Sequence, residues 1–533
     1  MSRSLTSAAI LCGLLAAPAI AQSPAQVASN AGPHTTAVGT HHVVRYVSQR
    51  TGSDRTGDGS AARPWAGIDH ALSQITDAGP ACTYAVLVAT GTYAGSTIHL
   101  KPYVDLYGGH DPSAWKRDVR AFATTLDGER ARRVIEGADH CRIDGFRIVR
   151  GRVRGRGAAV LCDAVSPSFT NNVFYDNRTE RPENWNPKEM HEDANDGGAV
   201  ACINGAAPAI ENDLFAANAT EAGRGGAVAC HRHAAPRIFR NVFVGNRTGL
   251  DDPQRSSDGG AISAWEYSNP EIAENVIVGN ETLASNDGGG LAIAYWTSAR
   301  LMHNLIVGNK GADDGGAAFV GGQKHHYGTP LDPVPSRDKF LVHFEGNLIA
   351  GNRNTAGSSG AMRVTMESRA IFVNNVFTDN PGGLYLQASE AELRNNAMLD
   401  PLRAVKESKS SKTPPGPTIL VNNRLRGGVK LEGLTANAER NVDADPILAA
   451  EGLTGSAEIG RRDENQFVSA VRVANANWQP GQFAGRAILA GDRWGVVRSN
   501  DRNTLWVWGL GEAAGVIELR ILPSFANLEN RHE

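Results

Sequence analysis

The sequence lacks a basic excess, a second membrane-length apolar run and a paired-cysteine metal motif. Its 53 Lys and Arg against 56 Asp and Glu give a formal net charge of -3, so the charge does not indicate nucleic acid as a partner. Aromatic residues make up only 6% of the 533 residues, whereas glycine occurs 59 times. This balance is typical of a turn-rich β architecture. The chain is too long for one compact core, but a solenoid avoids that limit because each repeat contacts only its neighbours.

Residues 1–21 are predicted to be a secretory signal peptide. Arg3 precedes an apolar run from Ala8 to Ala17, and Ala19-Ile20-Ala21 forms an A-x-A cleavage site. The apolar run is too short to span a bilayer. We therefore expect a secreted protein, extracellular or periplasmic, that is cleaved near Ala21, has no transmembrane segment and is a monomer. Residues 22–41 show little periodicity and predict a flexible leader.

A repeat dominates the middle of the chain. Its four copies read DGGAVACINGAAPAIENDLFAAN, RGGAVACHRHAAPRIFRNVFVGN, DGGAISAWEYSNPEIAENVIVGN and DGGGLAIAYWTSARLMHNLIVGN. Their second glycines are 28, 34 and 29 residues apart, and a period of 20–50 residues marks a solenoid. The apolar runs are too short for helices and are rich in Val, Ile and Phe. The repeat therefore predicts an all-β fold, a right-handed parallel β-helix.

The β-helix is expected to span residues 42–450, with insertions at 178–195 and 323–344. At its N-terminus, the amphipathic run Ala66–Ile75 predicts a short helix that forms a cap together with a strand. Residues 451–533 lose the repeat and predict a C-terminal β-rich cap or module. Tryptophans in such a small β unit are more often core than sugar platforms, and we favour the core role for four of them. These are Trp478, Trp494, Trp506 and Trp508.

Two recurring residue types are predicted to be structural. Cys162, Cys202 and Cys230 occupy one position of successive repeats, as expected of a buried ladder of small apolar side chains. Because export permits disulfides, a disulfide within this ladder is the alternative. The Asn that ends each repeat is expected to stack, with its amide bonding to the repeats above and below. These are Asn177, Asn218, Asn246, Asn280, Asn309, Asn352 and Asn380.

A family resemblance supports the predicted fold. The Tyr-Val, Gly-Asp-Gly-Ser and Pro-Trp elements near residues 46–65, followed by Val-Asp-Leu-Tyr-Gly-Gly and Ile-Asp-Gly-Phe, resemble the entry of secreted bacterial β-helix proteins of the pectin-lyase-like superfamily. The Gly-Gly-Ala and Phe-x-x-Asn elements resemble the repeats of polymorphic outer-membrane proteins. The resemblance covers roughly residues 43–400. It implies polysaccharide lyases and glycoside hydrolases as the common activities.

A calcium site is one hypothesis for the residues that precede the Gly-Gly pairs. Asp258, Asp287 and Asp314 would stack about 4.8 Å apart and repel one another. Carboxylates with turn carbonyls nearby suit Ca²⁺. Ordinary turn chemistry, in which Asp bonds to its own backbone, is the alternative. Arg224 lies between Asp196 and Asp258 and would relieve that pair, whereas Asp258, Asp287 and Asp314 have no such relief and Asp313 adds a further negative charge.

A polysaccharide surface is the second hypothesis. Alternation predicts that Val200, Val228 and Ile262 point inward, so that the small residues beside them form a flat outer floor. The expected floor residues are Ala199, Ala201, Ala227, Ala229, Ala261 and Ser263. Aromatic, imidazole and charged residues follow it and would bind sugar or transfer protons. The candidate catalytic residues are His231, His233, Glu266, Tyr267, Lys324, His325 and Arg363, and the candidate substrate-binding residues are Arg232, Trp265, Tyr295, Trp296 and Trp185. The alternative is that this floor packs beneath the insertions.

These features favour a secreted protein that binds, and if it is an enzyme cleaves, an acidic polysaccharide. A lyase needs a cation for the uronate carboxylate and a base for the α-proton, and the cationic rim fits that need better than it fits hydrolysis. A non-catalytic, adhesin-like glycan-binding solenoid is the alternative. The second alternative is a glycoside hydrolase, which needs two carboxylates and would use Glu266 with an Asp.

Overall fold

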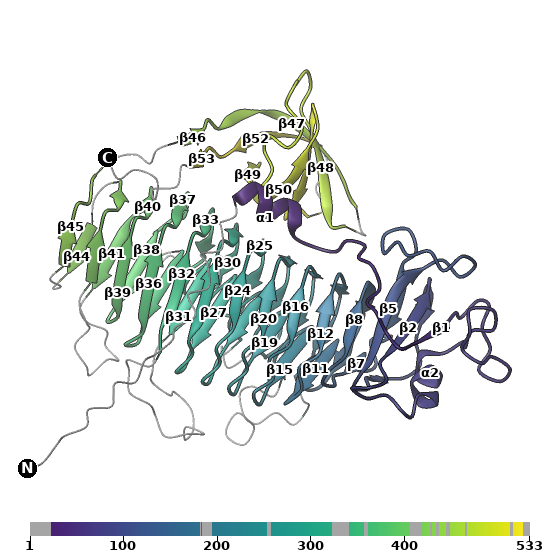
Figure 1. The fold of residues 1–533 in the computed structure, drawn as a ribbon. Coiled ribbons are helices and arrows are strands. Elements are labelled where there is room, and N and C mark those ends of the chain that lie inside the picture. Colours follow the sequence, from purple (N-terminus) through teal and green to yellow (C-terminus); the bar gives the residue numbers. More distant parts are fainter. Residues whose placement is uncertain are drawn as a thin grey trace, which may run out of the picture.

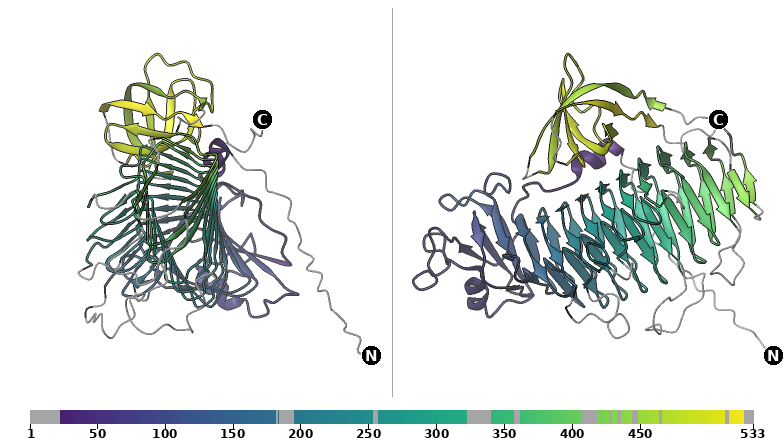
Figure 2. Two further views of the ribbon diagram at one scale, coloured as in Figure 1. Left: turned by 90° about the vertical axis from the view of Figure 1, so that its left-hand side faces the viewer. Right: turned by 180° about the vertical axis from the view of Figure 1, so that it is seen from behind.

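The computed structural model describes residues 23–181, 183, 195–252, 257–321, 340–356, 361–405, 418–426, 429–432, 436–443, 448–463, 466–511 and 515–525. Within these ranges, a stack of parallel coils carries a closed barrel on one side (Figure 1). Viewed close to the stack axis, the barrel sits against one face of the coils (Figure 2). The prediction of an all-β, right-handed parallel β-helix is confirmed. No helix in the described ranges is long and apolar enough to cross a membrane.

Each full coil passes through four sheets, which we call sheets I to IV in chain order. Sheet I comprises β1 (Val43–Val47), β2 (Tyr84–Ala89), β5 (Val104–His110), β8 (Arg142–Asp144), β12 (Ser168–Thr170), β16 (Ala209–Glu211), β20 (Arg237–Phe239), β24 (Glu271–Ala273), β28 (Ala299–Met302), β32 (Val342–Glu345), β36 (Arg369–Val373), β39 (Glu390–Arg394), β42 (Thr418–Val421) and β45 (Ala436–Glu439). Sheet II comprises β3 (Gly91–Tyr93), β6 (Thr124–Asp127), β9 (Phe146–Val149), β13 (Val173–Tyr175), β17 (Leu214–Ala216), β21 (Val242–Val244), β25 (Val276–Val278), β29 (Leu305–Val307), β33 (Leu348–Ala350), β37 (Val376–Thr378), β40 (Ala397–Met398) and β43 (Arg424–Leu425).

The other two sheets complete the coil. Sheet III comprises β10 (Arg152–Val153), β14 (Arg178–Thr179), β18 (Ala219–Thr220), β22 (Arg247–Thr248), β26 (Glu281–Thr282), β30 (Lys310–Gly311) and β34 (Arg353–Asn354). Sheet IV comprises β4 (Ile98–His99), β7 (Ile135–Glu136), β11 (Val160–Asp163), β15 (Val200–Ile203), β19 (Val228–Cys230), β23 (Ile262–Ala264), β27 (Leu291–Ala294), β31 (Ala318–Gly321), β35 (Met362–Thr365), β38 (Leu384–Gln387), β41 (Leu402–Val405) and β44 (Val429–Glu432).

Identical positions of successive coils stack inside the β-helix. The rings of Phe174 and Phe215 lie 4.5 Å apart and nearly parallel. Cys162, Cys202 and Cys230 pair in register on β11, β15 and β19, and all three are free and fully buried. This confirms the predicted thiol ladder over the disulfide alternative. At the N-terminal end, α2 (Ile68–Gln74) buries Ile68, Ala71 and Leu72 in the same core, as the predicted cap requires.

The predicted asparagine ladder is also confirmed. Asn246 Oδ1 accepts a hydrogen bond from the backbone N–H of Asn218 at 3.0 Å and another from its Nδ2 at 3.0 Å. Asn246 Nδ2 in turn donates to the carbonyl of Phe215. The Asn246 amide therefore satisfies two backbone groups of the preceding coil, which explains why a buried polar residue recurs at every turn.

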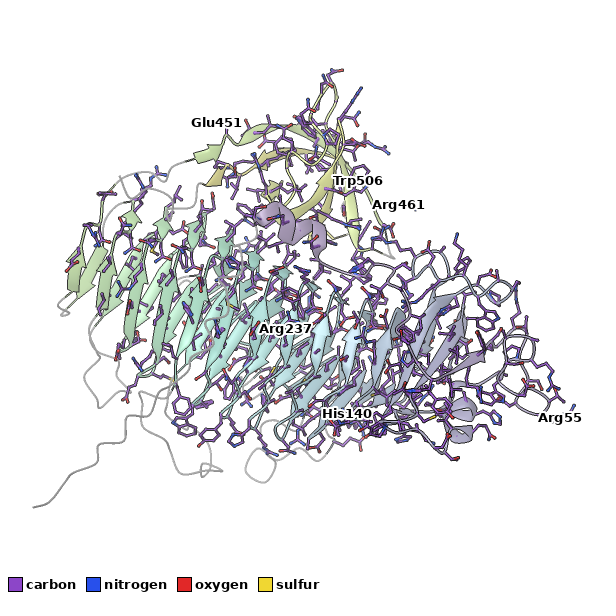
Figure 3. All side chains as sticks on the ribbon, in the orientation of Figure 1. Arg55, His140, Arg237, Glu451, Arg461 and Trp506 are labelled. Carbon is purple, nitrogen blue, oxygen red and sulfur yellow. The ribbon has the colours of Figure 1, made fainter. Side chains whose placement is uncertain are left out.

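The C-terminal module is a closed six-stranded barrel. Its strand order is β47 (Leu453–Asp463), β48 (Val468–Arg472), β51 (Thr504–Trp508), β50 (Arg493–Asn500), β49 (Ala487–Ala490) and β52 (Gly515–Ile521), and a short pair, β46 (Leu448–Ala450) and β53 (Ser524–Phe525), precedes and follows it. Trp478 packs in the barrel core with Phe483, as predicted. Trp494, Trp506 and Trp508 instead belong to an apolar cluster that joins the barrel to the outer face of sheet II. Trp506 is labelled on the barrel in Figure 3.

Residues 23–41 were predicted to be a flexible leader, and the structure corrects this. They form α1 (Pro24–Asn30) and an extended segment, and α1 lies between the barrel and the stack (Figure 1). Val27 and Ala28 are buried in the apolar cluster that joins barrel and sheet II. Arg117 donates to the carbonyl of Thr36 at 2.7 Å and ties the segment to the first coils. The sequence did not predict this helix, because the apolar residues of α1 pack at the interface between barrel and stack and form no separate core.

The insertion boundaries also need correction. Arg178 and Thr179 belong to sheet III, and Val342–Phe344 belongs to β32, so both predicted insertions are shorter than 178–195 and 323–344. The signal peptide and the candidate residues Trp185, Lys324 and His325 lie outside the described residues.

Candidate functional site

The outer face of sheet IV is not the open floor that alternation predicted. Ala199, Ala227 and Ala261 lie in the interior core. Ala201, Ala229 and Ser263 lie outside that core cluster, yet they are fully buried. The residues expected to form an exposed floor are therefore covered.

The Gly-Gly segment itself provides this cover. A Cβ placed on Gly225 would lie 2.2 Å from the carbonyl oxygen of Val228 and 3.1 Å from the Cα of Ala229. Gly259 approaches Ser263 in the same way, since a Cβ placed on Gly259 would lie 3.1 Å from the Cβ of Ser263. The segment before each strand thus folds back over the strand. This close approach requires glycine on one side and a small side chain on the other.

Folding back brings the residue before each Gly-Gly pair onto the outer face of sheet IV. The carboxylate of Asp196 lies 3.1 Å from Nδ1 of His231, and both side chains are buried. The Arg224 guanidinium lies 3.7 Å from the ring centroid of Trp265. The structure therefore joins the predicted residues His231 and Trp265 to Asp196 and Arg224, which the sequence placed in the charged column before the Gly-Gly pairs. The signal was present in the sequence, since Arg224 interrupts a series of aspartates.

The aspartates link successive coils. Asp258 Oδ1 accepts the backbone N–H of Asp287 at 2.8 Å, and Asp287 Oδ1 accepts that of Asp314 at 2.9 Å. Asp196 does the same for Arg224 at 2.6 Å. One oxygen of each of these carboxylates therefore bonds to the backbone of the next coil, and not to its own turn as the turn alternative described.

An acidic group lies further along this column. Carboxylate oxygens of Asp287, Asp313 and Asp314 lie within 4.8 Å of one another, whereas Asp258 is not part of this group. Burial, followed by the charges of Asp258 and Asp313, raises the pKa of Asp287 well above its usual value. Arg363 opposes this rise and forms an ion pair with Asp314. Its guanidinium thus brings positive charge to the place where the calcium hypothesis puts a cation.

The more accessible candidates lie in the turn after each sheet IV strand. In the turns after β15, β19, β23 and β27, two residues have positive φ, and their backbones bond from coil to coil: His233 N–H donates to Glu266 O at 3.0 Å, and Gly205 N–H donates to Arg232 O at 2.9 Å. This register stacks the side chains of equivalent positions. We call the column of Gly205, His233, Tyr267 and Trp296 the aromatic turn ladder.

The rings of this ladder are nearly parallel. His233 and Tyr267 lie 5.1 Å apart with 13° between their planes, and Tyr267 and Trp296 lie 5.4 Å apart with 10°. Trp296 is buried, whereas His233 is exposed. Gly205 continues the column beyond His233, and a Cβ there would meet nothing within 4 Å. His233 is therefore the outermost and most exposed ring of the ladder among the described residues.

The neighbouring column carries the charged candidates. Arg232 Nε lies 3.7 Å from Glu266 Oε2, so these two predicted residues form an ion pair in adjacent coils. Tyr295, the next residue in this column, packs on Trp265 with 4.3 Å between ring centroids. Trp265 in turn forms a small outer cluster with Ala294 and Phe319. The candidates after β19, β23 and β27 thus form two neighbouring columns, Arg232–Glu266–Tyr295 and the turn ladder, beside the buried residues His231 and Trp265.

Comparisons with known proteins do not assign the chain to a family. No protein-family model matches the sequence, and no curated protein is similar to it. Among solved structures, the GH136 lacto-N-biosidase from Eubacterium ramulus is similar at 13% identity and a TM-score of 0.33, over 75% of this chain and 67% of that one. The tailspike protein of E. coli bacteriophage HK620, solved in complex with a pentasaccharide, is similar at 11% identity and a TM-score of 0.29, over 90% and 93%. At these identities and TM-scores, neither protein says anything about the activity of this chain.

Proposed function

We propose that this is a secreted protein that binds an acidic polysaccharide along the aromatic turn ladder. The observation that carries the proposal is the His233–Tyr267–Trp296 stack itself, whose outermost ring, His233, is exposed. A pyranose ring presents apolar C–H groups on its face and stacks on aromatic surfaces, so a sugar placed above Gly205 continues the column. The Arg232–Glu266 pair beside the ladder supplies donors and acceptors for the hydroxyl and acid groups of the sugar.

Affinity electrophoresis through gels that contain polygalacturonate, alginate or a neutral glucan tests this proposal. Retardation in at least one acidic gel is expected. His233→Ala and Tyr267→Ala should each weaken it about tenfold, which corresponds to about 1.4 kcal/mol. His99→Ala, which changes an exposed histidine on β4 of the same sheet, is the matched control and should leave retardation unchanged. If the wild type migrates freely in every gel, or if the control weakens binding as much as His233→Ala, the proposal is wrong.

Cleavage by β-elimination is a second candidate, favoured by the buried Asp196–His231 pair. A carboxylate that holds one ring nitrogen orients a histidine as a general base. In such a reaction the base takes the proton α to the uronate carboxylate, the C–H electrons form a double bond, and the glycosidic oxygen leaves. Arg224 lies beside this pair and would neutralise the uronate. Because the His231 ring is fully buried, the substrate must displace the groups that cover it.

The products distinguish the three functions. A lyase gives unsaturated ends that absorb in the ultraviolet, and His231→Gln should abolish them while leaving retardation intact. A hydrolase gives new reducing ends without ultraviolet gain, and Glu266→Gln should abolish those. Binding with neither product leaves the non-catalytic function.

A further inference from the structure

A cleft lies between the barrel and the stack, separate from the aromatic turn ladder. Its volume is about 580 Å³, and it is lined by sheet III, the neighbouring turns of sheet II, and strands β47 and β50 of the barrel. Five arginines line it: Arg152, Arg178, Arg247, Arg462 and Arg493. Asp176 is the one carboxylate among its lining residues, and it pairs with Arg130 at 2.7 Å. The volume is in the range of small-ligand sites.

The three arginines of the stack belong to one column of sheet III. Arg152 pairs in register with Arg178, Arg178 with Ala219, and Ala219 with Arg247. At about 4.8 Å per coil, this column spans roughly 14 Å along the cleft. Two barrel arginines complete the lining, so the barrel and the stack both contribute cations to one space. The sequence signal is an Arg directly after the repeated Asn, as in Asn177-Arg178 and Asn246-Arg247.

Arg152, Arg247 and Arg493 each make few contacts within the protein. Arg152 contacts Glu180 at 3.2 Å, and Arg247 contacts Glu281 at 3.5 Å, each through Nε. Arg493 uses one Nη on the carbonyl of Leu510 at 2.8 Å. A guanidinium has five N–H donors, so single contacts of this kind leave several for a ligand. The side chain of Arg247 is 57% exposed, and Arg152 and Arg178 are about one third exposed.

We infer that this cleft binds the acid groups of an anionic oligosaccharide, carboxylate or sulfate. An arginine guanidinium can donate two parallel hydrogen bonds to the oxygens of a carboxylate or a sulfate. The roughly 14 Å column suits acid groups repeated along a short chain rather than one small anion. The lining includes Gly245, where an added Cβ would meet nothing within 4 Å, so a chain can approach the backbone closely at that turn.

Nucleic acid fits the cleft less well. Single strands bind to stacking platforms of several aromatic rings, whereas Phe467 is the one aromatic residue among those lining the cleft. The cleft lies on sheet III and the barrel, away from the turn ladder after sheet IV. Binding here therefore does not depend on the function proposed for the ladder, and the two can fail separately.

Calorimetric titration of the full chain tests the inference with three hexasaccharides: oligogalacturonate, chondroitin sulfate and a neutral cello-oligosaccharide. We expect at least one acidic probe to bind and the neutral probe to bind at least tenfold more weakly. Arg247→Gln and Arg493→Gln should each weaken acidic binding about tenfold. Arg247 is a safe position to change, because Glu281 keeps Lys310 as a partner at 2.6 Å. Thermal melting verifies that each variant is folded.

Arg353→Gln is the matched control, because Arg353 lies in the same sheet III column but outside the cleft. It should leave binding within twofold of the wild type. His233→Ala should also leave it unchanged, which separates this site from the turn ladder. The inference is overturned if no acidic probe binds, if Arg353→Gln weakens binding as much as Arg247→Gln, or if the acidic probes bind no more tightly than inorganic sulfate. Tighter binding of a single-stranded oligonucleotide would also overturn it.

Discussion

Asp213 Oδ1 accepts two hydrogen bonds from Asn172, one from the backbone N–H at 2.6 Å and one from Nδ2 at 3.1 Å. Asp213 occupies a place that asparagine holds in the neighbouring coils, where Asn241 Nδ2 donates to the carbonyl of Ile210. Asp213 Oδ2 is buried and has no hydrogen-bond partner among the described residues. Burial raises the pKa of this carboxyl well above its usual value. The ladder therefore favours the neutral acid, which imitates an amide.

Replacing Asp213 with Asn should stabilise the protein. Because the folded-state pKa is raised, the native state loses stability as the pH rises above the unfolded-state value, by about 1.4 kcal/mol per pH unit until the folded pKa is reached. Asp213→Asn removes that loss and supplies the missing donor. Chemical unfolding should show a gain of about 1–3 kcal/mol at pH 7, and the gain should shrink toward pH 4. A variant that is less stable at pH 7, or a gain that does not change with pH, would contradict this account.

Asp400 ends the other asparagine ladder and provides a test with a defined pH window. Burial raises its pKa from 3.8 to about 6, although Asn380 donates two hydrogen bonds to it. A raised pKa means that its protonated form stabilises the fold below pH 3.8 and that this contribution is lost between pH 3.8 and about 6. The full loss is about 3 kcal/mol before any discount for the remaining solvent exposure. Asp400→Asn should therefore flatten the melting temperature across that window, whereas Asp443→Asn, an exposed change, should not.

Gly225 and Gly245 form a matched pair for the folded-back segment. Both have positive φ, +66° and +63°, but a Cβ on Gly225 would clash with the Val228 carbonyl, whereas one on Gly245 would meet nothing within 4 Å. Gly245→Ala should lower the free energy of unfolding by about 1–2 kcal/mol, because a residue with a Cβ is strained at positive φ. Gly225→Ala should lower the free energy of unfolding at least twice as much, because the backbone at Val228 must also move to make room for the new Cβ. Equal losses in denaturant unfolding would show that the segment does not pack on the strand as tightly as described.

Much of the fold followed from residue spacing. Stacking makes position in the repeat equivalent to position in space, so Cys202 above Cys162 and the run of closing asparagines could be read directly from the sequence. The wrong prediction of an open floor has a physical cause. A period-2 alternation assumes that a strand's outer face meets solvent, but here the chain folds back over Ala229, and the barrel covers sheet II.

The candidate site was less predictable for the same reason. His231 and Trp265 were correctly singled out as departures from the repeat, but their partners Asp196 and Arg224 come from the segment that folds back, so spacing along one strand does not bring them together. The arginine cleft depends on where the barrel docks. No periodicity in the stack encodes that contact, although the glycines before the repeated Asn leave room for it.

Trp494 should control that docking. Cβ positions on Gly308 and Gly351 would lie 2.3 Å from Trp494 atoms, so this indole lies directly on the turns of sheet II. Trp494→Ala removes a large apolar contact and should cost about 3 kcal/mol of interface stability. Limited proteolysis should then release the barrel faster while the stack stays intact. Trp478→Phe, which keeps an aromatic ring in the barrel core, is the control that should not accelerate release.

Arg363 provides the sharpest test of the calcium hypothesis. In the structure its guanidinium pairs with Asp314 and opposes the pKa rise of Asp287, so the acidic group carries its own counter-charge. Removing that charge with Arg363→Ala leaves three close carboxylates to repel one another and should lower the melting temperature. Millimolar Ca²⁺ should restore the variant and shift the wild type less, because oxygen ligands at this spacing accept a hard cation once the arginine is gone. Mg²⁺, which demands tighter octahedral geometry, is the control and should restore less. If Ca²⁺ shifts neither protein, these carboxylates serve only the links between coils.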